Sequence, residues 1–454
     1  MLYTIWTIGC QMNKADSERV ASALKSIGLR PAAPGDVADV VVLNTCVVRG
    51  NAEEKVMGKL GALTGLKRRQ PDLLTAVMGC LVPTDREGLV RQFPQVDLFF
   101  TAGETARLVD LVESRGRASK SDGMASRQPN SACLADYPGG GRIEASPAEA
   151  PPASVVAIAR YVPIIYGCNN FCAYCIVPFR RGREASRPPD DILAHVTAYL
   201  GTGAREITLL GQNVDAYRGR GVAGAQGAPV DLAGLLRLVH EVPGLARLRF
   251  LTSHPRDMSD RLIAAVAELP KACPAINLPV QAGDDDVLRV MGRGYTVDDY
   301  RQLVGRMRRA IRGLALSTDL IVGFPGETDQ QFQHSMDLLA ELRFDMVHVA
   351  AYSPRPGTRA ASMVDDVSEA EKRRRLQAVE SLQAEIAGEI NSGLVGSTAE
   401  VLVEDRHKGK WRGRTPTDKI VFFEDAANWR GRLAQVRISK AGPWSLQGLV
   451  VGGE

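Results

Sequence analysis

The sequence lacks any apolar run long enough to span a membrane, and residues 1–8 are too short and not basic enough for a secretory signal. We therefore expect a cytoplasmic protein that makes no membrane contact. Its eight cysteines are spread over 454 residues. In a long chain with alternating strand and helix patterns, this distribution favours metal binding or catalysis in a reducing compartment over a disulfide framework.

A large net charge is also missing, since the formal value is only +4. Residues 401–454 carry ten Lys and Arg against six Asp and Glu, so the remainder of the chain is neutral. A local basic excess on a neutral protein suggests contact with a polyanion. A solvated surface explains the charge alone equally well.

Length and composition predict several domains with sizeable cores. We predict an N-terminal domain at 1–115, a disordered linker at 116–153, a central domain at 154–388 and a C-terminal domain at 389–454. The linker is rich in Ser, Gly, Pro and Ala and has no apolar periodicity. Cys133 lies within it, and we interpret it as a free thiol rather than a ligand.

Three cysteines, Cys168, Cys172 and Cys175, form a C-x3-C-x2-C array without a fourth Cys or His at ligand spacing nearby. A structural zinc site requires four protein ligands. Three cysteines can instead hold a cubane iron–sulfur cluster and leave one iron open to bind a small molecule. The alternative is three core thiols packed as small hydrophobes, which the polar residues around the array disfavour.

A second group of cysteines occurs in the N-terminal third. Cys10, Cys46 and Cys80 each stand where a short predicted strand ends, and Asp16 is a predicted N-cap of the helix that follows the first strand. Strands alternating with helices predict a parallel sheet, whose ligand sites lie beyond the carboxyl ends of the strands. The three cysteines should therefore meet at one edge. By spacing alone, a second cluster and a set of structural thiols are equally well supported.

The central domain alternates between strand and helix patterns, which indicates a βα barrel or a doubly wound sheet. Functional groups are expected at strand carboxyl ends; Gln212 follows the second predicted strand, and Ser317 and Asp319 lie within the fifth. The predicted strands are 161–166, 206–210, 247–252, 275–280, 314–322 and 345–352.

The C-terminal region begins with a predicted helix at 368–390, and short alternating runs then indicate a small β-barrel of OB-like size. Basic residues interleaved with an aromatic suit RNA, and guanidinium groups beside a reactive site suit phosphate. Salt bridging to acidic neighbours is the alternative for the arginines. The candidate RNA contacts are Arg180, Arg181, Arg183, Lys408, Lys410, Trp411, Arg412 and Arg414.

Several motifs together resemble the MiaB-type tRNA methylthiotransferases, which are radical S-adenosylmethionine (SAM) enzymes. The resemblance covers nearly the whole chain except the linker, and the HKGKWRGR stretch is similar to a TRAM domain. The sequence departs from the family pattern after Cys80 and at Asn277, where relatives commonly have His. The motifs are GCQMNKADSE, NTCVVRGNAEEK, YGCNNFCAYC, LLGQNVDAY, RFLTSHP, NLPVQAGDDDVLRVMGRGYT and STDLIVGFPGET.

The resemblance implies an α/β fold: an N-terminal parallel α/β domain, a central partial (β/α)6 radical SAM barrel and a C-terminal OB-like TRAM barrel. It implies that Cys168, Cys172 and Cys175 hold a [4Fe–4S] cluster whose open iron binds SAM. It also implies an auxiliary [4Fe–4S] cluster on the N-terminal triad, Cys10, Cys46 and Cys80. The implied SAM contacts are Tyr174, Gln212, Ser317 and Asp319, although a hydrogen-bonded strand-end role accounts for the last three equally well.

The activity implied by the resemblance is methylthiolation of C2 of N6-isopentenyladenosine at position 37, beside the anticodon of tRNA. It would consume two SAM per turnover, require an external one-electron donor and be carried out by a monomer. Sibling enzymes methylthiolate N6-threonylcarbamoyladenosine in tRNA or an aspartate of a ribosomal protein. The alternative from another class is a non-catalytic RNA-binding protein with zinc at its cysteines.

Overall fold

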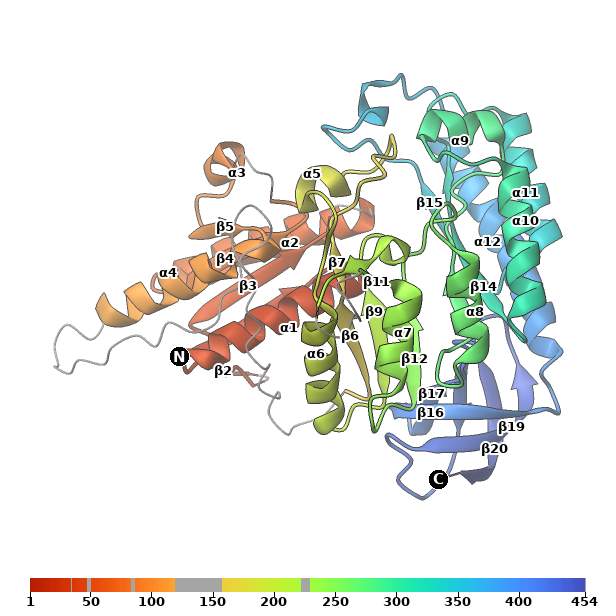
Figure 1. The fold of residues 1–454 in the computed structure, drawn as a ribbon. Helices are drawn as coiled ribbons and strands as arrows, with labels where there is room; N and C mark the ends of the chain where they lie inside the picture. Colours follow the sequence, from red (N-terminus) through yellow and green to blue (C-terminus); the bar gives the residue numbers. More distant parts are fainter. Residues whose placement is uncertain (34, 47–49, 83–85, 119–156, 222–228, 454) are drawn as a thin grey trace. The chain divides into compact units, whose positions relative to one another are not determined.

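The computed structural model describes residues 1–33, 35–46, 50–82, 86–118, 157–221 and 229–453 (Figure 1). The chain divides into two compact units. Unit 1 comprises Met1–Pro151 together with Phe179–Ala185, and unit 2 comprises Pro152–Pro178 together with Ser186–Glu454. Residues 119–153 of the predicted linker, including Cys133, lie outside the described residues, whereas residues 116–118 belong to a helix.

Unit 1 is built on a parallel five-stranded sheet with the order β2-β1-β3-β4-β5. This arrangement confirms the predicted N-terminal α/β fold. The strands are β1 (Leu2–Thr7), β2 (Arg30–Pro31), β3 (Val40–Thr45), β4 (Leu74–Gly79) and β5 (Leu98–Phe100). The helices are α1 (Gln11–Ser26), α2 (Gly50–Arg69), α3 (Glu87–Gln92), η1 (Ala102–Glu104) and α4 (Thr105–Ala118).

The central strand β3 is buried on both faces, as its unbroken apolar run requires. Because successive side chains point to opposite faces, Val40 and Val42 pack with residues of α1 and α4. Val41 and Leu43 pack with residues of α2 on the other face. The helices therefore cover both faces and leave the strand ends to carry the polar groups.

Helix α1 begins earlier than the sequence indicated. Its N-cap is Cys10, and Asp16 lies within the helix, where it is 1% exposed. The prediction of Asp16 as an N-cap was therefore wrong. Asp16 instead forms ion pairs with Arg19 of the same helix at 3.6 Å and with Arg181, remote in sequence, at 2.8 Å.

The core of unit 2 contains the six predicted parallel strands in sequence order. They form two three-stranded sheets, β12-β9-β6 and β13-β14-β15, which an isolated parallel bridge between Leu248 and Ala272 connects. The fourth strand is shorter than expected because Pro279 has no N–H to donate. The strands are β6 (Ala159–Pro163), β9 (Glu206–Leu210), β12 (Arg247–Phe250), β13 (Ala275–Asn277), β14 (Ala315–Val322) and β15 (Met346–Ala351).

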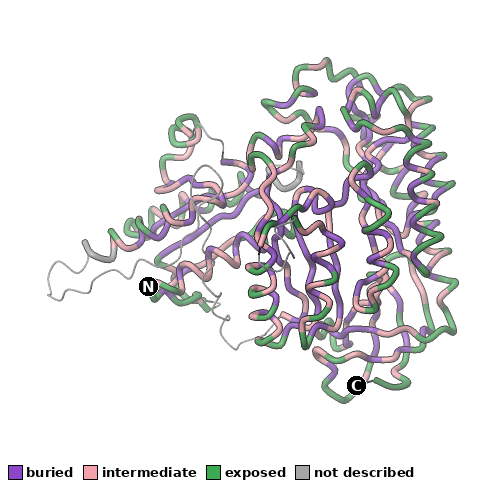
Figure 2. The backbone as a smooth tube through the Cα atoms, in the orientation of Figure 1, coloured by how far each residue is buried: buried purple, intermediate pink, exposed green. Residues whose placement is uncertain are grey.

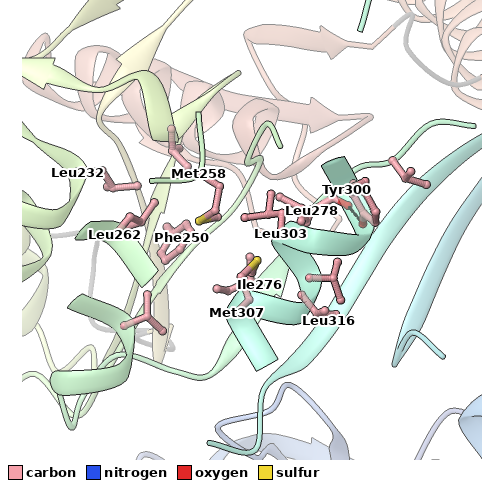
Figure 3. Close-up of a cluster of buried hydrophobic side chains, with 14 of the residues drawn as sticks. Leu232, Phe250, Met258, Leu262, Ile276, Leu278, Tyr300, Leu303, Met307 and Leu316 are labelled. Atoms are coloured by element: carbon pink, nitrogen blue, oxygen red, sulfur yellow. Dashed lines mark hydrogen bonds between the residues drawn. The ribbon is translucent and has the colours of Figure 1, made fainter. Parts of the chain in front are cut away.

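Helices pack their apolar stripes against these strands. Figure 3 shows Phe250, Ile276 and Leu316, from three successive strands, among side chains of α8 and α10. Figure 2 shows buried backbone along the strands and exposed segments on the outer sides of the helices. These helices are α6 (Pro189–Gly201), α7 (Leu232–His240), α8 (Asp260–Glu268), α9 (Asp285–Met291), α10 (Val297–Ala310) and α11 (Asp329–Leu342). The short helix α5 (Val177–Arg181) is divided between the units, with Phe179–Arg181 in unit 1.

Shorter elements complete the core. They are β7 (Ile165–Tyr166), β8 (Ala185–Ser186), η2 (Val214–Ala216), β10 (Arg218–Gly219), β11 (Val230–Asp231) and η4 (Ala360–Ser362). The long helix predicted at 368–390 is α12 (Glu369–Ser392), with Ser368 as its N-cap and Gly393 at its C-terminal end. Within the described part of the chain, no helix combines the length and the apolar character needed to cross a bilayer.

The C-terminal region forms a closed five-stranded barrel with the order β16-β17-β18-β20-β19, which confirms the predicted small β-barrel. Sequence reasoning missed β17, because only Trp411 and Gly413 of its five residues are buried. Gly413 is required there, since a Cβ would lie 2.3 Å from the Leu402 carbonyl oxygen. The strands are β16 (Thr398–His407), β17 (Lys410–Arg414), β18 (Ile420–Phe423), β19 (Leu433–Ala441) and β20 (Leu446–Gly453).

Two buried arginines of β12, its first residue Arg247 and its third residue Arg249, attach the barrel to the core. Arg247 contacts the Glu400 carboxylate at 2.9 Å, and Arg249 donates to the carbonyl oxygens of Thr415 and Pro416 at 2.8 and 3.0 Å. These contacts lie at the amino end of the strand. Within unit 2 the barrel therefore binds the end of the strands opposite to the end from which the cysteine loop leaves.

Candidate active site

The loop that carries Cys168, Cys172 and Cys175 follows β7 and is held by hydrogen bonds of the Gly167 and Ala173 backbone groups. The Gly167 N–H donates to Gln212 Oε1 at 2.7 Å. Further along, Ala173 donates to the Met291 carbonyl oxygen and accepts from the Ala360 N–H, both at 2.8 Å. These bonds connect the loop to the end of β9, to α9 and to η4, so three separate elements fix its conformation.

The three thiols of this loop influence one another. Burial raises the pKa of Cys175 to about 12, and the neighbouring Cys172 and Cys168 contribute to the rise. Cys172 is buried, and the other two are partly exposed. Within the described ranges, no three Cys, His, Asp or Glu side chains are gathered closely enough to share one metal ion. In a cubane each thiolate binds a different iron, and a cluster on this triad remains a prediction.

Sequence reasoning missed Arg293, which is 4% exposed and contacts this loop. Its Nη1 donates to the Cys172 sulfur at 3.3 Å and lies 3.4 Å from the Tyr174 hydroxyl. Arg293 belongs to the MGRGYT stretch that contributes to the family resemblance. An arginine between two glycines in that stretch was the available signal.

The four predicted SAM contacts lie on three segments of unit 2. Tyr174 is on the cysteine loop and Gln212 contacts that loop through Gly167. Ser317 and Asp319 lie on β14, where Asp319 accepts from the Asn277 amide at 3.0 Å. All except Tyr174 therefore occupy β14 or the end of β9, and Gln212 and Asp319 already have hydrogen-bond partners. Their contact with SAM remains a prediction.

The N-terminal triad lies at one edge of the sheet in unit 1. Asn44 is paired with Thr7 on one side and with Met78 on the other. Cys10, Cys46 and Cys80 each follow these positions within three residues, beyond the carboxyl ends of adjacent parallel strands. The Cys80 N–H donates to the Thr45 carbonyl oxygen at 3.0 Å. This is the edge at which the strand pattern predicted them.

The glycines before Cys10 and Cys80 permit a close approach of these strand ends. Gly9 has φ +132° and Gly79 has φ +99°. A Cβ on Gly9 would lie 2.5 Å from the Cys46 Cβ, and a Cβ on Gly79 would lie 2.3 Å from the Thr45 carbonyl oxygen. Both positions therefore require glycine, because a side chain there would clash with the neighbouring strand end.

A buried amide joins two of these strand ends. The Asn13 Nδ2 donates to the carbonyl oxygens of Ile8 and Thr45 at 2.8 and 2.9 Å. The Cys10 thiol lies 3.7 Å from Asn13 Oδ1. Asn13 therefore fixes the backbone just before Cys10 and just before Cys46, although sequence reasoning gave it no role.

The arginines that follow Cys175 differ in their surroundings. Arg181 pairs with the buried Asp16 at 2.8 Å and also contacts Asn13 Oδ1 at 3.3 Å, all within unit 1. Burial lowers the pKa of Arg180, and the nearby Cys80 acts in the opposite direction. Arg183 is exposed. Asp16 therefore holds the guanidinium of Arg181, and contact of the three arginines with RNA remains a prediction.

The predicted RNA contacts of the barrel also differ in exposure. Trp411 is 6% exposed, and its indole N–H donates to the carbonyl oxygens of Asp425 and Ala427. Its indole therefore packs in the barrel core, and its stacking on a base remains a prediction. Lys410, Arg412 and Arg414 form ion pairs with Glu424, Asp405, Glu404 and Asp418. Lys408 is exposed at the turn between β16 and β17.

Family comparisons agree with this arrangement of elements. Residues 3–101 match the uncharacterized protein family UPF0004, residues 162–339 match the radical SAM superfamily, and residues 394–451 match the TRAM domain. A radical SAM core flanked by these two domains defines the class of the enzyme. Membership of the superfamily implies a [4Fe–4S] cluster and SAM as cofactors.

Full-length relatives identify the family more narrowly. The chain is 48% identical over 453 residues to a Roseiflexus sp. protein named tRNA-2-methylthio-N(6)-dimethylallyladenosine synthase, covering 99% of this chain and 89% of the relative. The proteins of that name from Herpetosiphon aurantiacus and Chloroflexus aurantiacus are 45% and 47% identical, with 99% and 98% of this chain covered and 97% and 91% of the relatives. The chain belongs to the MiaB-type family of radical SAM methylthiotransferases.

Solved structures support the fold. The radical SAM methyltransferase TsrM from Kitasatospora setae matches with a TM-score of 0.56 and 14% identity, over 79% of this chain and 77% of that chain. At this identity the likeness concerns the fold alone.

Proposed function

We propose that this enzyme is a tRNA-2-methylthio-N6-dimethylallyladenosine synthase, which methylthiolates C2 of N6-isopentenyladenosine at position 37 of tRNA. The observation that carries the proposal is full-length identity of 42–48% to proteins of that name, together with the C-x3-C-x2-C loop and the edge that gathers Cys10, Cys46 and Cys80. Partners would be the tRNA anticodon loop and an external one-electron donor, and the enzyme would act as a monomer.

The two cysteine triads would have different roles in the reaction. Cys168, Cys172 and Cys175 would hold the SAM-binding cluster, and Cys10, Cys46 and Cys80 would hold the auxiliary one. When bound, the SAM-binding cluster would supply the electron that cleaves SAM, and the auxiliary cluster would be the site from which sulfur is delivered. Two SAM would be used per turnover. The donor chemistry fits, because both groups are thiols without an evident fourth protein ligand.

The protein itself would position the reacting partners. Gln212, α9 and η4 hold the cysteine loop in place, and Asn13 holds the ends of β1 and β3. The reacting base must leave the anticodon-loop stack, which costs little in a single-stranded loop. Because the barrel is attached at the amino ends of the core strands, we expect it to bind tRNA away from the reacting adenosine.

A complementation experiment tests the proposed function. The chain is expressed in a bacterium that lacks its own enzyme of this type, and tRNA nucleosides are quantified by mass spectrometry. Restoration of 2-methylthio-N6-isopentenyladenosine is expected. Methylthiolation of N6-threonylcarbamoyladenosine instead, or unchanged tRNA with a methylthiolated ribosomal aspartate, would assign the chain to a sibling activity.

The metal content separates the enzyme from the zinc alternative. Anaerobic reconstitution should give brown protein with roughly eight irons if each triad holds a cubane. Colourless protein that contains zinc would contradict the proposal.

A further inference from the structure

The two glycines that flank Arg293 in sequence shape the backbone turn in which it lies. Helix α9 ends at Met291, and Gly292 and Gly294 follow with φ of +73° and +70°. A left-handed backbone conformation costs little free energy only for glycine, and here a glycine adopts it on each side of Arg293. The turn is therefore tight at this point, and the Arg293 side chain is almost completely buried.

Every nitrogen of the guanidinium has a partner in the cysteine loop or the core. Nη1 contacts the Cys172 sulfur at 3.3 Å and the Tyr174 hydroxyl at 3.4 Å. Nη2 donates to the Pro279 carbonyl oxygen at 3.0 Å, and Nε donates to the Tyr295 hydroxyl at 3.0 Å. Two of the three nitrogens are thus fixed by the core, and the third is directed at a cysteine.

This buried cation has no carboxylate partner among the described residues, because none lies within ion-pair distance of Arg293. Three other buried arginines do have one: Arg247 pairs with Glu400, Arg249 with Glu206 and Arg375 with Glu327. An uncompensated buried charge is costly. The nearby group that becomes anionic on binding a metal is the Cys172 sulfur, since the thiolate is the ligand form of cysteine.

We propose that Arg293 is a positioning residue that donates an N–H···S hydrogen bond to Cys172 when this cysteine ligates the SAM-binding cluster, and so raises the reduction potential of that cluster. Reduction adds negative charge to the cluster, and hydrogen bonds and positive charge near a ligand sulfur stabilise the reduced state. The inference rests on the proposed function, because it assumes a cluster at this loop.

The test measures the midpoint potential of one cluster by an EPR-monitored redox titration. The parent carries Cys10→Ala, Cys46→Ala and Cys80→Ala, so that only the cluster of Cys172 remains. In this parent, Arg293→Met should lower the potential enough to shift the reduction equilibrium about tenfold, which is about 59 mV for one electron. Arg293→Lys, which keeps the charge, should recover most of the loss.

Arg256→Met is the matched control. Its Nη2 donates to Asn170 Oδ1 at 2.6 Å, on the same loop but not on a cysteine. We expect the potential of this variant to equal that of the parent. An equal fall in Arg256→Met and Arg293→Met would show a general effect of removing charge near the loop and would overturn the specific contact.

The remaining outcomes separate this inference from the proposed function. Iron-loaded Arg293→Met with the potential of the parent overturns the inference and leaves the function intact. A parent that binds no cluster overturns the proposed function. If Arg293→Met does not assemble a cluster, Arg293→Leu, which also lacks an N–H donor, decides: an unchanged potential contradicts the inference, and a lowered one supports it.

Discussion

Asp16 and Arg181 form a buried ion pair, with 2.8 Å between the carboxylate and the guanidinium, although 165 residues separate them in sequence. Their side chains are 1% and 8% exposed. Asp16 lies on α1, the helix that begins immediately after Cys10, and Arg181 lies in the short segment of unit 1 that follows Cys175 along the chain.

Removing one partner of this pair should destabilise the enzyme. Arg181→Met leaves the buried Asp16 charge with Arg19, at 3.6 Å, as its ion-pair partner, so the loss should approach the about 3–5 kcal/mol that breaking a buried pair costs. Calorimetry of the full chain should show a lower unfolding temperature. Arg91→Met, which breaks an exposed pair with Glu87, should change stability by less than about 1 kcal/mol.

A double variant distinguishes the pair from general loss of packing. Asp16→Asn combined with Arg181→Met removes both charges, so it should be less destabilised than the sum of the two single variants. Strict additivity would contradict an energetic coupling between them.

The cysteine loop should be essential for SAM cleavage. Cys175→Ala removes one of three ligands, so the variant should lose roughly four irons and form no 5′-deoxyadenosine from SAM. Chromatography of the anaerobic reaction measures this product. Cys273→Ala is the matched control, because Cys273 is buried in the core of unit 2 and burial raises its pKa to about 11. Equal activity of the Cys175 variant and the parent would exclude the loop as the cluster site.

The auxiliary triad should be needed for sulfur insertion and not for SAM cleavage. Cys46→Ala should retain part of the 5′-deoxyadenosine formation while making no 2-methylthio product. The two products are quantified in one reaction by mass spectrometry. Full methylthiolation by this variant would refute the role of the second cluster.

A buried carboxyl group in unit 2 predicts a pH dependence of stability. Burial raises the pKa of Asp215 to about 7, and Asp257 adds to the rise, while hydrogen bonds from the Ser253 hydroxyl and the His254 N–H act against it. The unfolded chain has a pKa near about 3.9. The folded state binds the proton of the Asp215 carboxyl group more tightly than the unfolded state does. The contribution of Asp215 to the stability of the fold is therefore fully present below about pH 4 and is lost as the pH rises towards about 7.

Asp215→Asn should therefore gain stability relative to the parent between pH 5 and pH 8. Thermal unfolding of both proteins at the two pH values measures the change. A constant difference between parent and variant at both pH values would show that Asp215 does not retain its proton in the folded state.

The exposed Lys408 should contribute to tRNA affinity through charge alone. Lys408→Gln should weaken binding and reduce the slope of log affinity against log salt by about one. Fluorescence anisotropy with labelled tRNA at several salt concentrations measures the slope. Arg309→Gln on an exposed position of α10 should leave it unchanged. Identical slopes for Lys408→Gln and the parent would place the RNA elsewhere.

Local pattern was sufficient for much of the fold. The apolar runs of β3 and β4 and the turns after them predicted a parallel sheet, and the six strand segments of the core occur in the predicted order. Helix α12 (Glu369–Ser392) lies where the pattern at 368–390 predicted a helix. Periodicity and capping are properties of neighbouring residues, so they can be read from sequence. Strand β17 was not predicted from the sequence because one of its two buried positions is a glycine.

Contacts between side chains that are remote in sequence were not predicted. Nothing near Arg293 in the chain indicates that its guanidinium meets Cys172, 121 residues away, and the basic run at 180–183 gave no sign that Arg181 pairs with Asp16. Long polar side chains look alike in a sequence whether they face water or a buried partner. The sequence by itself determined which residues can bind iron, because a thiol is a ligand by its chemistry. Only the tertiary structure decided which charges surround those thiols, because such contacts form when distant segments pack together.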